Sequence, residues 1–381
     1  MRYLSLAIAH GHGERWGGSG AYELAMSSTP RPTPPGWLPA VLNGGWTYRD
    51  RVDRAGEGQL VCDFYAERHP HSGRETWLRR LASGEIRRHD LPLLGDAPLA
   101  WGDRLAWQRP PWQEAAVPGC WETVLDDGDL LALNKPSGLP VMPAGGFLEH
   151  TLLRLLERRH ASDPAGIPRP VHRLGRFTSG LLLCARQPTS RAWLSARLRE
   201  STARLEDSIP ANGGTAAIGS IPEDLPHGCR KLYRALISPS ALGLRIGDTL
   251  CLTTPIARQP HRRLGSIWAA GSPDDAAALV ARSDLTLLEQ RSDADLVEVA
   301  ISSGRPHQIR IHCAAAGAPL LGDPLYQAGG DALPDALPGD GGYRLHARCV
   351  QLPRPDGLCL LLATAATPGL WWTHNGERWE P

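Results

Sequence analysis

The sequence predicts an α+β protein: a mixed, mostly antiparallel β-sheet domain with flanking helices, preceded by a small α+β module. Three observations predict this. Apolar or alternating runs bounded by Gly and Pro turns dominate after residue 121, short helical periodicities separate some of them, and a Pro-rich stretch divides the two parts. With 381 residues the chain is long enough for two or three domains.

The expected organisation has five parts, each marked by a change in composition. We expect a flexible leader rich in Gly, Pro, Ser and Thr, a small module, a Pro/Trp-rich linker, the main domain with an aperiodic insertion loop, and a C-terminal tail. The corresponding ranges are 1–42, 43–110, 111–120, 121–365 with the insertion at 208–228, and 366–381.

Charge and cysteine usage exclude several classes of protein. Lys+Arg 41 against Asp+Glu 40 gives a net charge of +1, so a polyanionic partner would need a local basic patch. The 8 Cys include no Cys-x-x-Cys pair, which argues against a zinc site or a disulfide frame and favours a reducing compartment. His10 and His12 alone do not make a metal site. No apolar run approaches the roughly 18 residues of a membrane span, and the start lacks the order of a signal peptide, so we expect a cytoplasmic protein without a membrane segment.

The small module carries one clear helical pattern. Residues 76–81 have apolar positions at helical spacing and a basic face, and a turn at 83–86, a short strand and a Gly-Asp turn at 102–103 follow. Arginines of this region are placed to contact phosphate oxygens from one face, which predicts salt-sensitive binding of nucleic acid. They are Arg79, Arg80, Arg87 and Arg88.

In the main domain, strands and helices alternate irregularly. The expected strands lie at 129–134, 180–185, 231–237, 296–301, 345–348 and 358–363, and the expected helices at 151–159, 190–204 and near 305–314. No internal repeat is visible.

Residues 170–185 organise the domain. The charged block His172-Arg173 meets the small turn Thr178-Ser179-Gly180, and the chain then enters an apolar run typical of a buried strand. Polar groups held at a loop by a rigid strand are commonly placed for binding or catalysis. The alternative is a solvated turn with exposed arginines.

This stretch resembles the signature loop of the RluA-type RNA pseudouridine synthases, His-Arg-Leu-Asp-x-x-Thr-Ser-Gly. Three further blocks follow the family's order: Asn134-Lys135-Pro136, Lys231-Leu232-Tyr233 and residues 304–324. The departure is Gly175, which stands where the family has its catalytic Asp. The resemblance implies a main domain of pseudouridine-synthase type. Residues 44–110 resemble the S4 RNA-binding module in a looser form, and an ordinary small α+β domain is the alternative.

The family resemblance also implies the site. Arg173 would fill the space left by an everted base, Tyr233 would lie against the uracil, and Arg310 would neighbour the catalytic carboxylate. His172 and Lys135 would either contact phosphate or be structural. His307 and Gln308 would orient the loop. The partner would be RNA, bound by a monomer without a small-molecule cofactor or a metal.

Two functions stay open because glycine supplies no acid. The first is a divergent synthase that isomerises uridine in rRNA or tRNA with another group, and the second is a silent RNA-binding relative or RNA chaperone. Glu149 and Asp129 are conceivable replacement acids, whereas family members that keep the loop Asp also have the turn of Asp323. Without the acid, Arg310 is expected to face a hole unless a phosphate, another acid or water fills it, because leaving a buried cation unpaired is costly.

Overall fold

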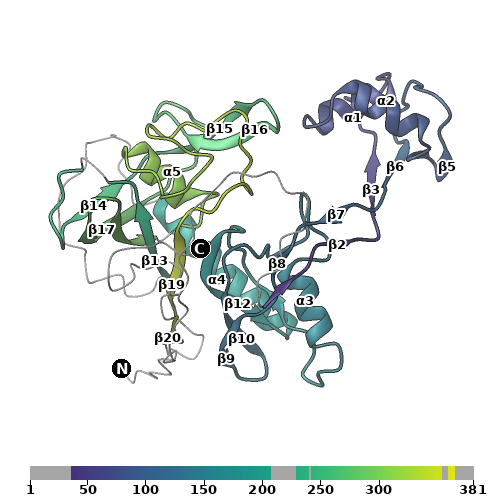
Figure 1. Ribbon diagram of the computed structural model, residues 1–381. Coiled ribbons are helices and arrows are strands. Elements are labelled where there is room, and N and C mark those ends of the chain that lie inside the picture. Colours follow the sequence, from purple (N-terminus) through teal and green to yellow (C-terminus); the bar gives the residue numbers. More distant parts are fainter. Residues whose placement is uncertain (1–35, 207–228, 240–241, 302, 354–358, 365–381) are drawn as a thin grey trace, which may run out of the picture.

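The computed structural model describes residues 36–206, 229–239, 242–301, 303–353 and 359–364 (Figure 1). The parts predicted as most of the leader, the 208–228 insertion and the 366–381 tail lie outside these residues, as do His10 and His12. The described part contains a small module, a two-stranded arm and a large main domain, and it is α+β with mostly antiparallel strands. The predicted fold class is confirmed.

The small module packs two helices on a four-stranded sheet. The helices are α1 (Val61–Arg68) and α2 (Arg74–Ala82), and the sheet has the order β3-β6-β4-β5. Its strands are β3 (Trp46–Arg51), β6 (Arg104–Arg109), β4 (Ile86–Arg88) and β5 (Leu91–Pro92). The helix predicted at 76–81 falls within α2. In the core between helices and sheet, Tyr65 stacks on Trp77, and Trp77 meets Trp107 edge to face. The S4 resemblance of this module stays a prediction.

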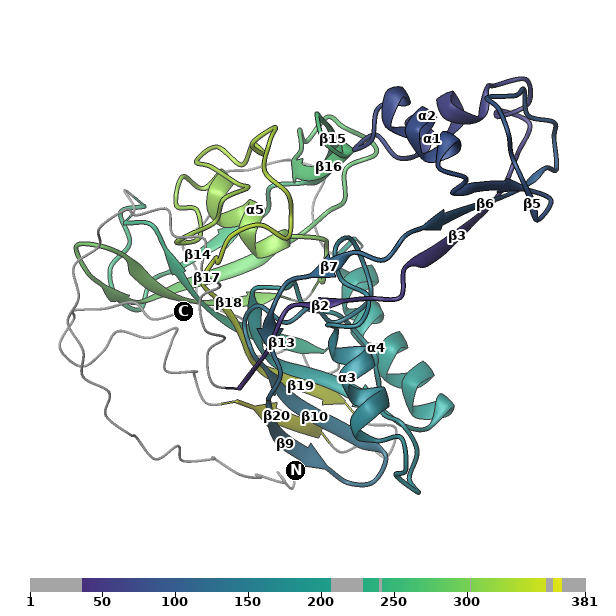
Figure 2. The same cartoon turned by 45° about the vertical axis from the view of Figure 1, so that its right-hand side comes forward.

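A two-stranded arm joins the module to the main domain (Figure 2). One side is formed by β1 (Trp37–Leu38) and β2 (Val41–Leu42), and the other by β7 (Gln113–Glu114) and β8 (Val117–Pro118). β1 pairs with β8 and β2 with β7. The expected boundaries are therefore wrong here: residues 36–42 are not leader but the partner of the predicted 111–120 linker, because each satisfies the backbone hydrogen bonds of the other.

A buried carboxylate anchors this arm to the main domain. Glu114 accepts hydrogen bonds from the backbone N–H groups of Leu148, Glu149 and His150 and from the side-chain amide of Asn43. Burial alone would raise the pKa of Glu114, but these donors hold it below its ordinary value. The arm is thus fixed to the chain segment that leads into the next helix.

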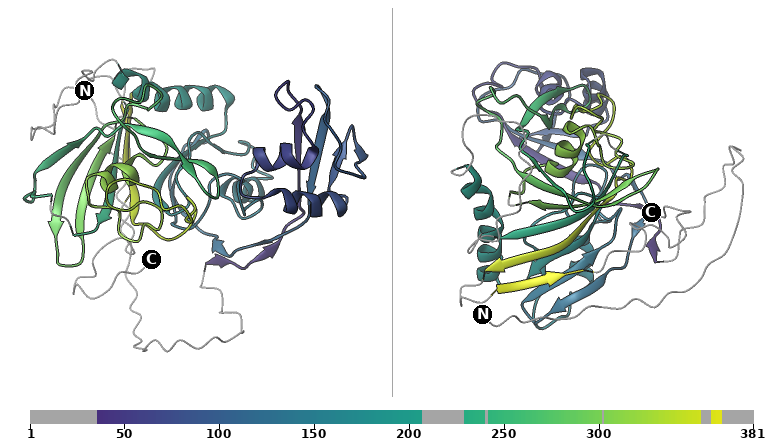
Figure 3. Two further views of the ribbon diagram at one scale, coloured as in Figure 1. Left: turned by 90° about the horizontal axis from the view of Figure 1, so that it is seen from above. Right: turned by 90° about the vertical axis from the view of Figure 1, so that its left-hand side faces the viewer.

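The main domain is built on a ten-stranded sheet with the order β14-β17-β18-β13-β19-β12-β10-β9, with β11 paired to β12 and β20 to β19 (Figure 3). Its strands are β9 (Glu122–Asp126), β10 (Leu130–Lys135), β11 (Arg169–Pro170), β12 (Thr178–Ala185), β13 (Arg230–Ile237), β14 (Thr249–Leu252), β17 (Ser283–Gln290), β18 (Asp295–Ile301), β19 (Leu345–Pro353) and β20 (Cys359–Ala363). A separate hairpin comprises β15 (Ile256–His261) and β16 (Gly265–Ala270).

Helices cover both faces of this sheet. α3 (Leu152–Arg159) and α4 (Pro188–Glu206) pack on opposite faces of β12, since its alternate residues belong to two different apolar clusters. α5 (Gln308–Ala315) packs over β13, β17 and β18 through Ile309 and Cys313. The apolar run at 180–185 is therefore a fully buried strand, as its composition predicts.

The β12–β19 contact is the one parallel pair among the described strands of the sheet, and a glycine permits it. Gly180 lies opposite Ala347 with φ +102, and a Cβ there would lie 2.2 Å from the Ala347 carbonyl oxygen. Only glycine allows this approach and this backbone angle. The contact fixes where the loop before β12 leaves the sheet, and that loop carries Gly175.

Candidate functional site

The loop between β11 and β12 presents its polar block at the surface. Arg173 and Gly175 are exposed, whereas Leu174 between them is buried in the cluster that contains α3. The loop returns on itself through a hydrogen bond from the backbone N–H of Thr178 to the carbonyl of Gly175. The arrangement holds residues 173 and 175 on the same side of an anchored turn.

Arg310 does not face a hole. Its guanidinium donates two hydrogen bonds of 2.7 Å to the two carboxylate oxygens of Asp323, and the side chains are 3% and 0% exposed. Burial by itself would lower the pKa of Arg310, but the bond to Asp323 raises it above its ordinary value. Asp323 also caps the turn by accepting from the N–H of Leu325. Of the possibilities left open for Arg310, the structure has another acid, since the carboxylate of the 322–326 turn neutralises it.

Tyr343 occupies the space beside Gly175. The Arg310 guanidinium carbon lies 4.1 Å from the centre of the Tyr343 ring. A Cβ built on Gly175 would lie 2.2 Å from the Tyr343 hydroxyl oxygen and 3.6 Å from its ring carbon Cζ. The hydroxyl shares a 3.3 Å hydrogen bond with Thr178. A phenol, and not a carboxylate, is thus the polar group packed against residue 175.

Tyr343 was missed by the sequence reasoning. It precedes the predicted strand at 345–348 in the order Tyr-Arg-Leu-His, directly after a Gly-rich loop. A large side chain placed just outside a strand and far along the chain from a small residue is a weak signal. Only the fold brings residue 343 to residue 175.

Tyr233 lies on β13 between Val299 of β18 and Ala347 of β19. Ala347 in turn pairs with Gly180 at the end of the signature loop. Partly buried, Tyr233 packs against two apolar clusters, one with Leu174 and the other with Tyr343. Burial raises the pKa of its phenol, which therefore stays protonated at neutral pH. Its place beside both flanks of the loop agrees with the prediction that it faces the same site.

Lys135 is enclosed by the loops it connects. Its ammonium donates to the carbonyls of Pro136, Leu139 and Arg176, at 2.7 to 3.0 Å. Its side chain is fully buried, and burial lowers its pKa to about 7. All three donors of an ammonium are used in this way. The structure therefore favours the structural alternative over phosphate contact, since Lys135 ties the 136–139 turn to the signature loop.

His172 is used within the loop as well. Its Nε2 accepts a 3.0 Å hydrogen bond from the backbone N–H of Leu183, and burial lowers its pKa to about 3. A ring nitrogen that accepts a backbone bond is neutral. In this arrangement His172 supplies no positive charge for RNA. Its bond to the Leu183 N–H instead fixes the loop backbone directly before Arg173.

His307 and Gln308 hold the start of α5. His307 has a left-handed φ of 56 and shares a 2.6 Å hydrogen bond between Nδ1 and the Tyr326 hydroxyl. Burial and the neighbouring Arg310 lower its pKa to about 3, and the charge of Arg173 acts in the same direction. Gln308 bonds Ser303 and the carbonyl of Arg282. These contacts orient the start of the helix that carries Arg310, and the predicted role in orienting the loop stays a prediction.

The four arginines predicted to share one face of the small module do not. Arg79 is exposed on α2, and Arg80 stacks between Trp77 and Trp107, 4.3 and 4.4 Å from their ring centres. The remaining two lie on β4, where Arg88 forms a 2.5 Å ion pair with Asp103. Successive residues of a strand point to opposite faces of its sheet, so Arg87 and Arg88 cannot contact one surface together.

The two other acids considered as replacements are engaged elsewhere. Asp129 accepts from the backbone N–H of Gln187 and from the Ser190 hydroxyl, and Glu149 pairs with Arg158. Neither has a contact with the 173–178 loop among those found. Within the described ranges, no group of three or more His, Cys, Asp or Glu side chains is placed to hold a metal ion. No helix there is both long and apolar enough to cross a membrane.

Comparison with known proteins gives consistent matches. The family model for RNA pseudouridylate synthase matches residues 129–206. An uncharacterized RNA pseudouridine synthase of Synechocystis is 37% identical over 75% of this chain and 87% of its own length. This chain belongs to the RNA pseudouridine synthase family. RNA pseudouridine synthase 5 of Arabidopsis thaliana is 36% identical over 82% of this chain and 89% of its own. Ribosomal large subunit pseudouridine synthase D of Nitrosomonas europaea is 30% identical over 67% of this chain and 64% of its own length.

Gly175 lies at the centre of the residues predicted to form the site. They are brought together around it: Arg310 through Tyr343, Tyr233 through the flanking clusters, and Arg173 on the same turn. The closest group to residue 175 is the buried phenol of Tyr343, which is bonded to Thr178.

Proposed function

We propose that this protein captures a uridine of structured RNA at the Gly175 site and isomerises it to pseudouridine. The observation that carries the proposal is the continuous contact from Gly175 through Tyr343 to the Arg310–Asp323 pair, in a chain of the pseudouridine synthase family. The base must leave its stack to reach such a site, which costs a few kcal/mol.

The proposed roles follow from position. Arg173, exposed on the loop, enters the stack in place of the everted base. Tyr233 supports the uracil, a contact worth about 1–3 kcal/mol for stacking. Arg310 acts through Asp323 and Tyr343, which fix the wall of the site. Isomerisation breaks the N1–C1′ bond and forms the C5–C1′ bond, the proton on C5 is released, and N1 takes up a proton. The reaction is redox-neutral and we propose that it uses no cofactor.

The substrate class is inferred from a relative. Because one similar protein is named a ribosomal large subunit pseudouridine synthase, we take ribosomal RNA as the first candidate and tRNA as the second. We further infer a monomer that acts in the cytoplasm, since four cysteines within the described residues are buried as free thiols, as suits a reducing compartment.

A second candidate function is a silent RNA-binding relative. The observation that favours it is the 2.2 Å approach of the Tyr343 hydroxyl to the Cβ position of residue 175, combined with an Asp323 whose oxygens both bind Arg310. A carboxylate nucleophile is the group this chemistry uses most directly, and those two contacts leave none beside Gly175.

Tritium release from an rRNA transcript labelled at uracil C5 tests the proposal. We expect the wild-type protein to release tritium and Tyr233→Phe to release it more slowly while its affinity for the transcript is kept. Tyr65→Phe is the matched control, because Tyr65 is buried against Trp77 in the core of the small module, away from Gly175. A wild-type protein that binds the transcript without releasing tritium would contradict isomerisation and establish the second candidate.

A further inference from the structure

One face of the small module's sheet is rich in arginine. Along β3 and β6, Arg49 and Arg51 share a face with Arg104, because Arg51 lies opposite Arg104 and Arg49 lies opposite Ala106. Arg87 of β4 also lies opposite Ala106 and so joins the same face. We call these four residues the arginine face. The other face of the sheet carries Trp107 and packs against α1 and α2.

This face has more positive charge than its surroundings neutralise. Asp90 is the carboxylate paired with it, 3.6 Å from both Arg49 and Arg104. The side chains of Arg49 and Arg104 are 72% and 68% exposed. Arg51 and Arg104 are like charges directly opposite each other across two strands, which is unfavourable without an anion between them. Since the whole chain is almost neutral, the charge is a local property of this surface.

The helical side of the module differs. Its arginines are largely matched by acids: Arg74 pairs with Asp63 and Asp96, and Arg68 with Asp50. The loop between α1 and α2 also contacts the main domain, where Pro70 would lie 2.8 Å from a Cβ on Gly265 of the β15–β16 hairpin. The sheet side is thus the one with charge left for a ligand.

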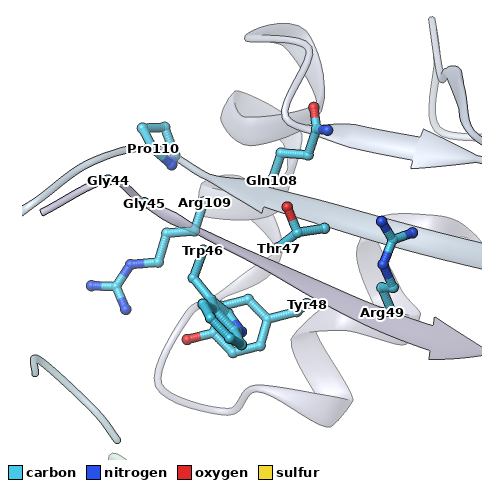
Figure 4. Close-up of a pocket in the computed structure, with 9 residues that line it drawn as sticks. All are labelled: Gly44, Gly45, Trp46, Thr47, Tyr48, Arg49, Gln108, Arg109 and Pro110. Carbon is cyan, nitrogen blue, oxygen red and sulfur yellow. The ribbon is translucent and has the colours of Figure 1, made fainter. Parts of the chain in front are cut away.

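A groove continues the arginine face toward the arm (Figure 4). It has a volume of about 880 Å³, and Thr47, Arg49 and Gln108 extend into it from the side of the arginine face. Its lining also includes Trp46, Tyr48 and Arg109, which project from the opposite face of the ribbon. Hydroxyl, amide and guanidinium groups in one open groove suit the oxygens of a sugar–phosphate backbone. Arg109 also donates to the carbonyl of Gly145, so the groove ends at the main domain.

We propose that the arginine face and this groove bind the sugar–phosphate backbone of the RNA, with a double-stranded stem as the occupant. Four guanidinium groups on neighbouring strands can contact successive phosphates of a helix without reading its sequence. The inference rests on the proposed RNA function and adds to it the surface that holds the substrate beside the Gly175 domain.

Binding of a synthetic RNA hairpin with a long stem, measured by fluorescence anisotropy across a salt series, tests this. We expect Arg51→Gln/Arg104→Gln to bind about tenfold more weakly near 0.1 M salt and to lower the salt slope by about two. The matched control is Arg54→Gln/Arg245→Gln, which removes the same charge from exposed positions outside the arginine face and should leave both quantities close to wild type. Arg51→Lys/Arg104→Lys keeps the charge and should keep the slope.

Each outcome decides the matter. Equal binding by wild type and Arg51→Gln/Arg104→Gln would overturn the arginine face while leaving isomerisation untouched, because tritium release does not enter this measurement. An equal loss in the control pair would mean that binding follows net charge and would overturn the arginine face as the binding surface. A wild-type protein that fails to bind the hairpin would overturn RNA capture by this surface altogether. Circular dichroism verifies that each variant is folded, and the lysine pair serves if the glutamine pair is not.

Discussion

The Gly175 site and the arginine face hold arginine in opposite ways. At the first, Arg310 is buried, bonded to both oxygens of Asp323 and covered by the ring of Tyr343. At the arginine face, Arg49 and Arg104 are exposed and share the carboxylate of Asp90, which lies 3.6 Å from each of them. A buried charge has to be matched by the protein itself, because losing water is costly. An exposed charge keeps its water and can exchange it for a ligand. The contrast indicates that Arg310 shapes the Gly175 site, whereas the arginine face is suited to receive a substrate.

The largest expected effect breaks the internal pair. Asp323→Asn removes the charge that neutralises Arg310, and we expect the free energy of unfolding to fall by about 3–5 kcal/mol, because a buried cation is left without its partner. Urea denaturation measures this. The matched change on the arginine face, Asp90→Asn, should stay within about 0.5 kcal/mol of wild type. Similar losses in both would contradict the distinction between the two regions.

A smaller effect tests the packing at residue 175. Its backbone angle does not require glycine, so the obstacle to a side chain is the Tyr343 hydroxyl at 2.2 Å. Gly175→Ala and Gly175→Asp should each cost about 1–3 kcal/mol from overpacking. In Tyr343→Phe the nearest ring carbon is Cζ at 3.6 Å, so Gly175→Asp/Tyr343→Phe should regain most of that loss in thermal unfolding.

The same variants address catalysis. The double variant should release tritium from labelled RNA faster than Gly175→Asp alone, because the new carboxylate then has room to adopt a working conformation. If Gly175→Asp is as stable and as fast as the double variant, the Tyr343 hydroxyl is not the obstacle described.

Acidification should weaken the signature loop. The pKa of His172 is lowered to about 3, so between pH 6.5 and 3 the unfolded chain binds a proton that the folded chain does not. The neutral form of His172 makes its full contribution to stability above pH 6.5, and this contribution is lost as the pH falls towards 3. Going from pH 6.5 to 5.5 should cost about 1 kcal/mol through this residue. His172→Gln keeps an acceptor for the Leu183 N–H and should lack that part of the decline. Parallel pH curves for both proteins would contradict a neutral, buried His172.

The smallest effect sharpens the arginine face. Asp90→Asn removes its one paired carboxylate, and asparagine tolerates the positive φ of 67 found there. We expect binding of the RNA hairpin to strengthen by about two- to fivefold at low salt. Unchanged binding would mean that RNA does not contact this part of the sheet.

Much of the main domain could be predicted from the sequence. The apolar run after Gly180 has to be a buried strand, and the alternation at 231–237 has to face two environments. The Asp323–Arg310 pair could not be predicted, because it depends on where α5 lies relative to the 322–326 turn. The same holds for Tyr343, which the fold alone carries to Gly175. In the small module, the sequence prediction places Arg87 and Arg88 on one surface, whereas neighbouring residues of a strand point to opposite faces of the sheet.

The arm has a further consequence, for the modular construction of the chain. Its two sides come together where the module begins and ends: the N–H of Asn43 donates to the carbonyl of Trp112 at 3.2 Å. The chain segment between these two residues therefore begins and ends at adjacent positions of the arm. Excising that segment and closing the gap with a tight turn should leave the Glu114 anchor intact, since Asn43 and the donors at 148–150 lie on the retained side. We therefore expect that the small module can be removed or exchanged without disturbing the sheet of the main domain, from which the Gly175 loop extends.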